Sequence, residues 1–363
     1  MQINTGHTGR HLPFLDGCRG IAILIVVIGH AGLGWIIPGK FGVTLFFFIS
    51  GYLITRLLLT EIQATGRINM PHFYLRRFFR LYPALLAMIL FSIVLGFFMH
   101  APVPKNDVIC SLFYFTNYYI GWIRPVVPDA YRLLDIIWSL SVEEHFYFFF
   151  PILTLAFMRP GKKKESIFMG ILVAVSVIAL LFRCQLFFLS GMSQEDIAGR
   201  IYFSTHTRMD SILWGCIASF IVYRKANPRL LTFITSPAAF YAGLVLILLS
   251  VAIRNEAFRQ TLLFDFQGIG LLLLVPSLHY TRFGRFRQVT EQPVLMYIGK
   301  ISYSLYLFHW GASKLANALY AEYSFPWQLL FWSLTIALSL GSYYFIEKPF
   351  MKLRRRFGST ATS

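Results

Sequence analysis

The sequence contains little charge for its length. Only 13% of its 363 residues are Asp, Glu, Lys or Arg, whereas a soluble globular protein carries about 25%. Hydrophobic residues make up 56%, and the mean hydropathy is +0.61. These values exclude a water-soluble domain, a disordered chain, collagen and a coiled coil. They predict one polytopic membrane domain.

Cysteine is also scarce, and its four positions are scattered. No CxxC pair and no Cys/His spacing typical of zinc is present, so neither a metal site nor a disulfide framework is predicted. Nucleotide-binding glycine motifs and the GxSxG and HExxH motifs are absent as well. The four cysteines are interpreted as small hydrophobic residues.

Long apolar runs are abundant, and ten of them match the roughly 20 residues needed to cross a hydrocarbon core of about 30 Å. They lie near 13–36, 41–60, 81–99, 138–158, 166–189, 207–223, 236–253, 262–280, 297–318 and 326–346. The sequence therefore predicts an all-α transmembrane bundle of about ten spans.

Basic residues outnumber acidic ones by 33 to 16, which gives a net charge of +17. In a soluble protein this excess would suggest nucleic-acid binding. Here the basic residues gather in every second loop, as the positive-inside rule requires of cytoplasmic loops. We therefore expect both termini inside, no nucleic-acid partner, a membrane domain over 1–350 and a basic cytoplasmic tail over 351–363.

The apolar segment 106–122 does not fit this alternation. Counting it as an additional span would place the lysine run 162–164 outside. Its Trp and Tyr residues suit a membrane interface. We expect a re-entrant or interfacial segment.

Charged residues inside a span are costly and are functional candidates by default. Arg19 and His30 lie eleven residues apart in the first run. This spacing places them on one helix face, about 16 Å apart along the axis. A buried histidine bonded to a backbone carbonyl is the alternative for His30, but the face shared with Arg19 favours function.

Two more pairs are candidates. Arg77 and Arg80 share a helix face at the predicted inner boundary, where arginine forks bind phosphate, although spacing alone favours a lipid-headgroup patch. Glu143 and Glu144 open an apolar run, and a carboxylate beside a histidine raises its basicity for general-base work.

Weaker candidates for a substrate pocket are Ser50, Tyr147, Asp210 and His309. Ser50 precedes Gly51, and close helix packing is the favoured interpretation of this pair. Asp210 is predicted to form a structural or pocket-lining pair with Arg208. His309 is either a ligand contact or a core histidine.

Taken together, these segments resemble a known family. The ordered set is LDGCRGIAILIVVIGH, FFFISGYLI, FYLRRFFRLYP, WSLSVEEHFYFFFP, RMDSILWGC, ISYSLYLFHW and YFIEKPF. It is similar to the acyltransferase-3 family of integral membrane, acyl-CoA-dependent O-acyltransferases. The likeness covers essentially the whole chain and is most specific in its first 150 residues.

The resemblance implies about ten transmembrane helices in a bacterial cytoplasmic (inner) membrane. It implies transfer of an acyl group, commonly acetyl, from cytoplasmic acyl-CoA to a hydroxyl of a carbohydrate, glycolipid or related acceptor. Acyl-CoA would be a co-substrate, with no permanently bound cofactor. Many bacterial members carry an added SGNH hydrolase-like domain, whereas this chain is expected to be a stand-alone member without it.

The same resemblance suggests roles for the candidate residues. Arg77, Arg80 and Arg19 would receive the phosphates of the donor, and the pantetheine arm would carry the thioester toward His30. His30 would act as general base or as a transient acyl carrier, with Glu143 or Glu144 orienting it. The alternative is a transporter or flippase of glycans or lipids, which shares buried charge but does not by itself predict an arginine pair beside a histidine.

Overall fold

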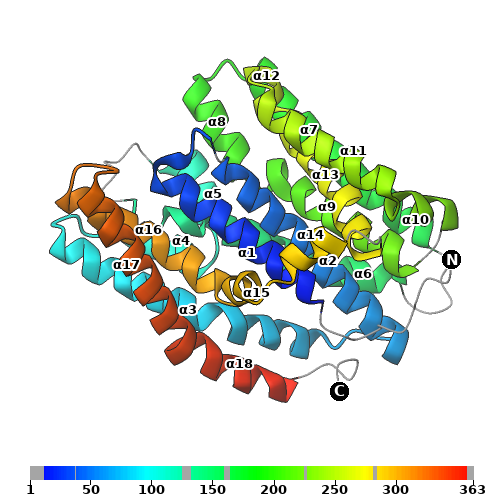
Figure 1. Ribbon diagram of the computed structural model, residues 1–363, viewed down its shortest axis with the longest axis horizontal. Coiled ribbons are helices and arrows are strands. Elements are labelled where there is room, and N and C mark those ends of the chain that lie inside the picture. The colour runs from blue at the N-terminus through cyan, green and yellow to red at the C-terminus, as the bar shows by residue number, and fades with distance from the viewer. Residues whose placement is uncertain are drawn as a thin grey trace.

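The structure is a computed structural model that describes residues 12–36, 38–124, 132–158, 164–224, 227–280 and 284–357. All the regular elements in these ranges are helices. Figure 1 shows the long helices side by side, with α3 and α18 along one edge and α7 and α11 along the opposite one. The predicted all-α class is confirmed.

A helix occupies each of the ten apolar runs. Their bounds are α1 Pro13–Ile28, α2 Gly39–Thr65, α3 Met70–Phe98, α6 Trp138–Met158, α7 Glu165–Leu189, α9 Thr205–Arg224, α11 Pro237–Ala252, α13 Leu263–Tyr280, α16 Ser302–Leu319 and α17 Phe325–Ser342. Two of them continue into π-helical turns, α1 into η1 Gly29–Leu33 and α17 into η5 Tyr343–Glu347.

Fewer of the described helices meet the length and hydropathy of a membrane span than the ten apolar runs predict. Among the described residues, five helical stretches are long and apolar enough to span, or six if the bent pair Pro228–Ile234 and Pro237–Ala252 is one span. Helix α9 falls short because it contains Arg208 and Asp210. The ten-span count and the cytoplasmic termini therefore stay predictions.

Two segments depart from a continuous span. Residues 106–122, predicted not to cross, are divided among the short elements α4 Lys105–Leu112, α5 Thr116–Tyr118 and η2 Tyr119–Ile123. The run 297–318, predicted to be one helix, breaks at Ile301 between α15 Pro293–Lys300 and α16. The break lets α15 pack against α1, where a Cβ on Gly299 would lie 1.8 Å from the Asp16 carbonyl oxygen.

Helices α2 and α9 are in backbone contact in the core. A Cβ added to Gly51 would lie 2.0 Å from the Ile212 carbonyl oxygen, and one added to Gly215 would lie 2.0 Å from the Phe48 carbonyl oxygen. Small residues allow such backbone contact where lipid gives helices little hydrophobic reason to associate. The close packing predicted for Gly51 is confirmed.

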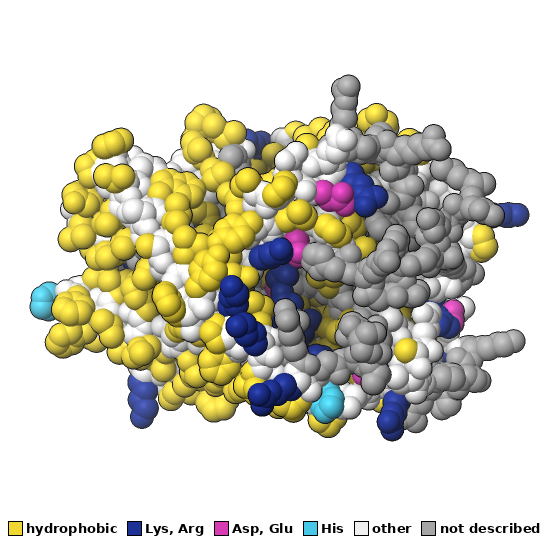
Figure 2. All heavy atoms as spheres, turned by 60° about the horizontal axis from the view of Figure 1, so that its bottom comes forward, with side chains coloured by type: hydrophobic (Ala, Val, Ile, Leu, Met, Phe, Trp, Pro, Cys, Tyr) yellow, Lys and Arg dark blue, Asp and Glu magenta, His cyan; other side chains and the backbone are white. Residues whose placement is uncertain are grey.

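The outer helices present apolar side chains to their surroundings. Leu189 of α7, Phe97 of α3 and Phe345 of η5 are among the large hydrophobic residues that stay exposed. Figure 2 shows hydrophobic side chains over much of one face, with Lys and Arg side chains gathered near its middle. This surface fits a bilayer with a polar opening better than it fits water.

Replacement of Gly51 by Ala tests the α2–α9 contact. Gly51→Ala is expected to lower the free energy of unfolding by about 1–3 kcal/mol or more, because the added methyl group overpacks the backbone. Thermal unfolding in detergent measures the effect. In the control, Gly170→Ala on α7, no heavy atom lies within 4 Å of the new Cβ, so it should leave stability unchanged or raise it by up to about 1 kcal/mol. Equal effects of the two substitutions on stability would contradict the close α2–α9 contact at Gly51.

Candidate active site

A cavity of about 80 Å³ lies between α1, α2, α3, α6 and α16. Arg19 enters it from α1, and Arg77 and Arg80 enter it from one face of α3, three residues apart. Ser50 and Glu143 line it from α2 and α6. The structure thus brings together the three arginines that the sequence predicted from two separate segments.

Glu143 organises one wall of this arginine cavity. Its Oε2 accepts hydrogen bonds from Ser50 Oγ at 2.9 Å and from the Tyr147 hydroxyl, one helical turn further along α6, at 2.8 Å. The guanidinium carbon of Arg77 lies 3.6 Å from the centre of the Tyr147 ring, close enough for a cation–π interaction. Glu143 therefore holds the aromatic surface on which Arg77 rests.

Two further carboxylates balance the arginines. Glu144 interacts electrostatically with Arg77, and its buried Oε1 has no hydrogen-bond partner among the described residues. Glu347 accepts a hydrogen bond from Ser304 and interacts electrostatically with Arg80 and Arg19. Glu347 could not be placed here from the sequence alone, because 328 residues separate it from Arg19.

Two tyrosines of α16 line the cavity and were missed in the sequence. The Tyr303 hydroxyl donates to the Leu81 carbonyl at 2.8 Å, and the Tyr306 hydroxyl lies 2.6 Å from Ser139 Oγ. Both occur in the apolar segment ISYSLYLFHW, where aromatic residues are common in a membrane helix and give no local signal. They are recognised as site residues only because the structure places both of them in the lining of the same cavity.

His30 lies beyond the lining of the cavity, in the π-helical turn η1. Its Nδ1 is 3.2 Å from Nε2 of His309 on α16, and His309 Nδ1 is 3.0 Å from the Leu305 carbonyl oxygen. A carbonyl only accepts, so His309 Nδ1 carries a proton and, in a neutral ring, Nε2 accepts. His30 then donates from Nδ1, which leaves its Nε2 with a free lone pair.

One aromatic ring separates the arginine cavity from this histidine pair. The Tyr306 ring lines the cavity, and its centre lies 5.8 Å from that of the His309 ring. The predicted contact of a glutamate with His30 is not what the described residues show: the ring bonded to His30 is His309. Glu143 instead bonds Ser50 and Tyr147, beside the arginines.

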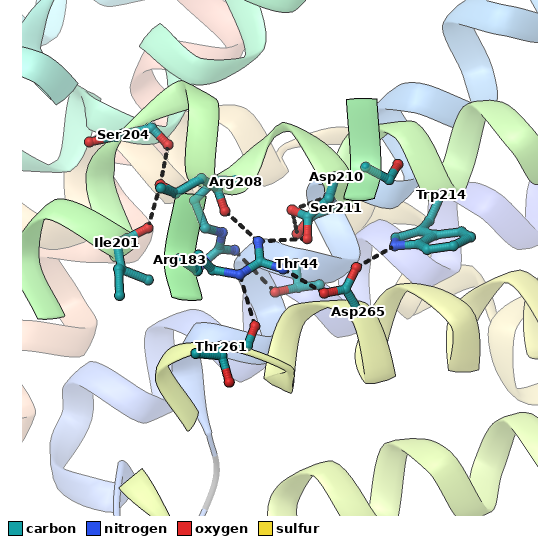
Figure 3. Close-up of polar contacts among 12 residues, drawn as sticks. Thr44, Arg183, Ile201, Ser204, Arg208, Asp210, Ser211, Trp214, Thr261 and Asp265 are labelled. Atoms are coloured by element: carbon teal, nitrogen blue, oxygen red, sulfur yellow. Dashed lines mark hydrogen bonds and ion pairs between the residues drawn. The ribbon is translucent and has the colours of Figure 1, made fainter. Parts of the chain in front are cut away.

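Asp210 belongs to a different cluster, shown in Figure 3. Arg183 of α7 contacts Asp210 Oδ2 at 2.7 Å and Asp265 Oδ2 at 2.5 Å, and it donates from Nε to the Thr261 carbonyl at 2.8 Å. Arg208 interacts with Asp210 electrostatically, while it donates a hydrogen bond to Thr44 and stacks 3.8 Å from the Phe264 ring centre. Arg183 thereby ties α7, α9 and α13 together, with Asp210 as its partner on α9.

The likeness to known proteins agrees with this geometry. The profile of a family described as an acyltransferase domain, acyltransferase-3, matches residues 12–347. The chain belongs to the acyltransferase-3 family. Together with its apolar helices, this membership makes it a multi-pass membrane protein.

The curated relatives include proteins named for acetyl transfer. A "Putative O-acetyltransferase" of Staphylococcus aureus (strain COL) is 33% identical over 359 residues, which are 94% of this chain and 58% of the relative. "O-acetyltransferase OatA" of Staphylococcus aureus (strain NCTC 8325 / PS 47) is 30% identical over 364 residues, which are 95% of this chain and 58% of the relative. The chain therefore spans a little over half the length of these relatives.

The structural role of Asp210 can be tested through stability. Asp210→Asn is expected to lower the free energy of unfolding by about 3–5 kcal/mol, because it removes one partner of a buried ion pair. Thermal unfolding in detergent, with and without acyl-CoA, provides the measurement. As a control, Arg287→Gln breaks the half-exposed pair with Glu291 and should cost about 0–1 kcal/mol. Normal stability of Asp210→Asn with lost ligand binding would instead make Asp210 a pocket residue.

Proposed function

We propose that this chain is a membrane O-acyltransferase. In this proposal it moves an acyl group, acetyl by analogy with the names of its relatives, from cytoplasmic acyl-CoA to a hydroxyl of a carbohydrate or glycolipid. The observation that carries the proposal is the convergence of Arg19, Arg77 and Arg80 on one cavity, with a histidine pair one aromatic ring beyond it. Because the relatives named here are bacterial, we assign it to a bacterial cytoplasmic membrane.

The arginine cavity suits the phosphates of coenzyme A. Three guanidinium groups from two helices present planar donor forks, which match phosphate oxygens in pairs. The Glu143–Tyr147 contact holds one of them, Arg77, at a fixed place. From Arg19 the helix axis rises about 16 Å to His30, a length comparable to the pantetheine arm. The thioester would then reach the histidine while the nucleotide stays at the arginines.

His30 supplies the proton acceptor in this scheme. Its free Nε2 takes the proton of the acceptor hydroxyl, whose oxygen bonds to the thioester carbonyl carbon. The carbon–sulfur bond then breaks, and the coenzyme A thiolate leaves with the electron pair and recovers the proton from His30. His309 is a positioning residue, because its hydrogen bond to His30 Nδ1 favours the tautomer whose Nε2 accepts; the Val26 carbonyl is a further hydrogen-bond partner of His30. If His30 were a transient acyl carrier, the same Nε2 would receive the acyl group.

The histidine pair gives the first test. His30→Ala should lower kcat by about 10²–10⁴-fold, the usual contribution of a general base. His309→Leu should lower kcat with little change in KM for acetyl-CoA, and His309→Gln should recover part of the loss, because its amide oxygen can accept from His30. Purified protein in nanodiscs, assayed with labelled acetyl-CoA, gives these values.

The pH profile distinguishes positioning from a purely structural role. Loss of tautomer control in His309→Leu should shift the acidic limb of kcat against pH, while His309→Gln should restore it. Full activity of His30→Ala at normal protein level would refute the proposed mechanism. If all His309 variants kept the parent kcat and the parent dependence of kcat on pH, His309 would have no part in the proposed mechanism.

The arginine cavity gives the second test. Arg80→Ala should raise KM for acetyl-CoA by about tenfold or more, as expected for a lost charge-assisted bond to phosphate. Acetyl-dephospho-CoA lacks the 3′-phosphate. If one of the three arginines binds that phosphate, its alanine variant and the parent protein should have the same KM for acetyl-dephospho-CoA. The comparison among Arg19→Ala, Arg77→Ala and Arg80→Ala assigns that arginine. Unchanged KM in all three variants would contradict donor binding in this cavity.

A further inference from the structure

A second hollow, of about 160 Å³, lies between the loop after α1, the start of α2, the end of α11, α12 Glu256–Gln260 and the start of α13. Lys40, Arg254 and Arg259 supply its basic side chains, Trp35 lies on its rim, and Gln267 lines it from α13. We call it the cationic pocket. Figure 1 shows α12 and the loop between α1 and α2 toward the same end of the bundle.

The cationic pocket carries an excess of positive charge. Within the described ranges, no carboxylate lies at ion-pair distance from Lys40, Arg254 or Arg259. The acid closest in sequence, Glu256, accepts a 2.6 Å hydrogen bond from Gln260. Arg259 and Arg208 repel Lys40, whereas Glu256 attracts it, and the Lys40 ammonium lies 5.0 Å from the centre of the Tyr202 ring. An anion bound between such like charges relieves their repulsion, so the pocket is suited to a phosphate or a carboxylate.

A buried polar group in the same pocket also lacks a partner. Gln267 is only 2% exposed, and within the described part of the chain its Oε1 makes no hydrogen bond. Buried amides are normally satisfied, and an exception calls for an explanation. A ligand hydroxyl entering the pocket would supply the missing partner. A ligand with both hydroxyl groups and a negative charge would pair with the Gln267 amide oxygen and with the basic side chains.

The rim adds a third feature. Trp35 is 74% exposed, although it lies beside charged groups. Its flat apolar ring is able to cover the apolar face of a sugar ring, leaving the sugar hydroxyls to polar neighbours. The combination of an aromatic platform, an unsatisfied amide and three cations points to an acidic saccharide and not to a simple anion.

The cationic pocket lies at the His30 end of α1. Trp35 follows His30 by five residues, and a Cβ on Gly39, which also lines the pocket, would lie 3.7 Å from the Cα of Gly29 beside His30. Arg19 of the arginine cavity lies on the other side of His30 along α1. The two hollows therefore flank the histidine along this helix.

We propose that the cationic pocket binds the phosphate or carboxylate of an acidic saccharide acceptor, so that a hydroxyl of the same saccharide reaches His30. This inference rests on the proposed function, because it identifies the class of acceptor for that reaction. The positive charge selects acidic over neutral saccharides, and Gln267 and Trp35 select a saccharide over inorganic phosphate.

Direct binding tests the inference separately from catalysis. The full chain in phosphatidylcholine nanodiscs is titrated by calorimetry with glucuronate, glucose 6-phosphate, glucose and inorganic phosphate. The two acidic sugars should bind at least about tenfold more tightly than either glucose or phosphate. R254Q/R259Q should abolish this preference. K105Q/R229Q, which removes the same charge at two exposed positions elsewhere, should retain it.

A second variant addresses the buried amide. Q267L keeps the three cations and a similar side-chain volume but removes the polar group. It should weaken the binding of both acidic sugars while leaving the thermal unfolding temperature unchanged or raised, since an unsatisfied buried group disappears. Loss of stability together with binding would make Gln267 merely structural and would overturn its assigned contact.

A lipid headgroup offers the same phosphate chemistry, and a separate arm distinguishes it. Nanodiscs containing phosphatidylglycerol should give the same sugar affinities. Phosphatidylglycerol bound at these arginines without any sugar binding would overturn the saccharide assignment, as would equal binding of glucose, inorganic phosphate and the acidic sugars. If acidic sugars bind as expected but no acyl transfer occurs, the proposed function fails and the pocket stands.

Discussion

The cost of placing a charged side chain in a hydrocarbon environment governs this structure. Each such residue needs a partner of opposite charge, a ring face or a ligand, because lipid offers no compensation. Arg183 meets this demand completely, with Asp210, Asp265 and a backbone carbonyl around one buried guanidinium. That network joins three helices and leaves no group for chemistry.

The arginine cavity meets the same demand differently. Arg77 rests on the Tyr147 ring and interacts electrostatically with Glu144, while Glu347 interacts electrostatically with Arg80 and Arg19. All three arginines line the open space of one cavity. Such an arrangement is unfavourable for a purely structural core. It is what a site needs in order to exchange protein partners for the phosphates of a ligand.

Helix packing makes this cavity possible. On α2, Gly51 lets α9 approach to backbone contact, while the adjacent Ser50 points to Glu143 in the cavity. Successive helical residues lie about 100° apart, so one face of α2 closes the core and the next lines the site. Ser50 and Gly51 are neighbours in the sequence, but Gly51 contributes to helix packing and Ser50 contributes to the site. The rigid α2–α9 pair thereby sets one wall against which α3 and α6 place their polar groups.

The ordered motifs of the sequence identified the family. The sequence by itself also determined the all-α class, the positions of most of the long helices and the helix face that Arg77 and Arg80 share. These features follow from hydrophobic run length and from the 3.6-residue period, which are local properties of the chain. Tertiary structure alone decided that His30 pairs with His309 and not with a glutamate, that Asp210 contacts Arg183 directly, and that Glu347 joins the arginines. The physical reason is that helical spacing fixes which residues share a face, whereas the choice of facing helix and its rotation depend on packing across the whole bundle.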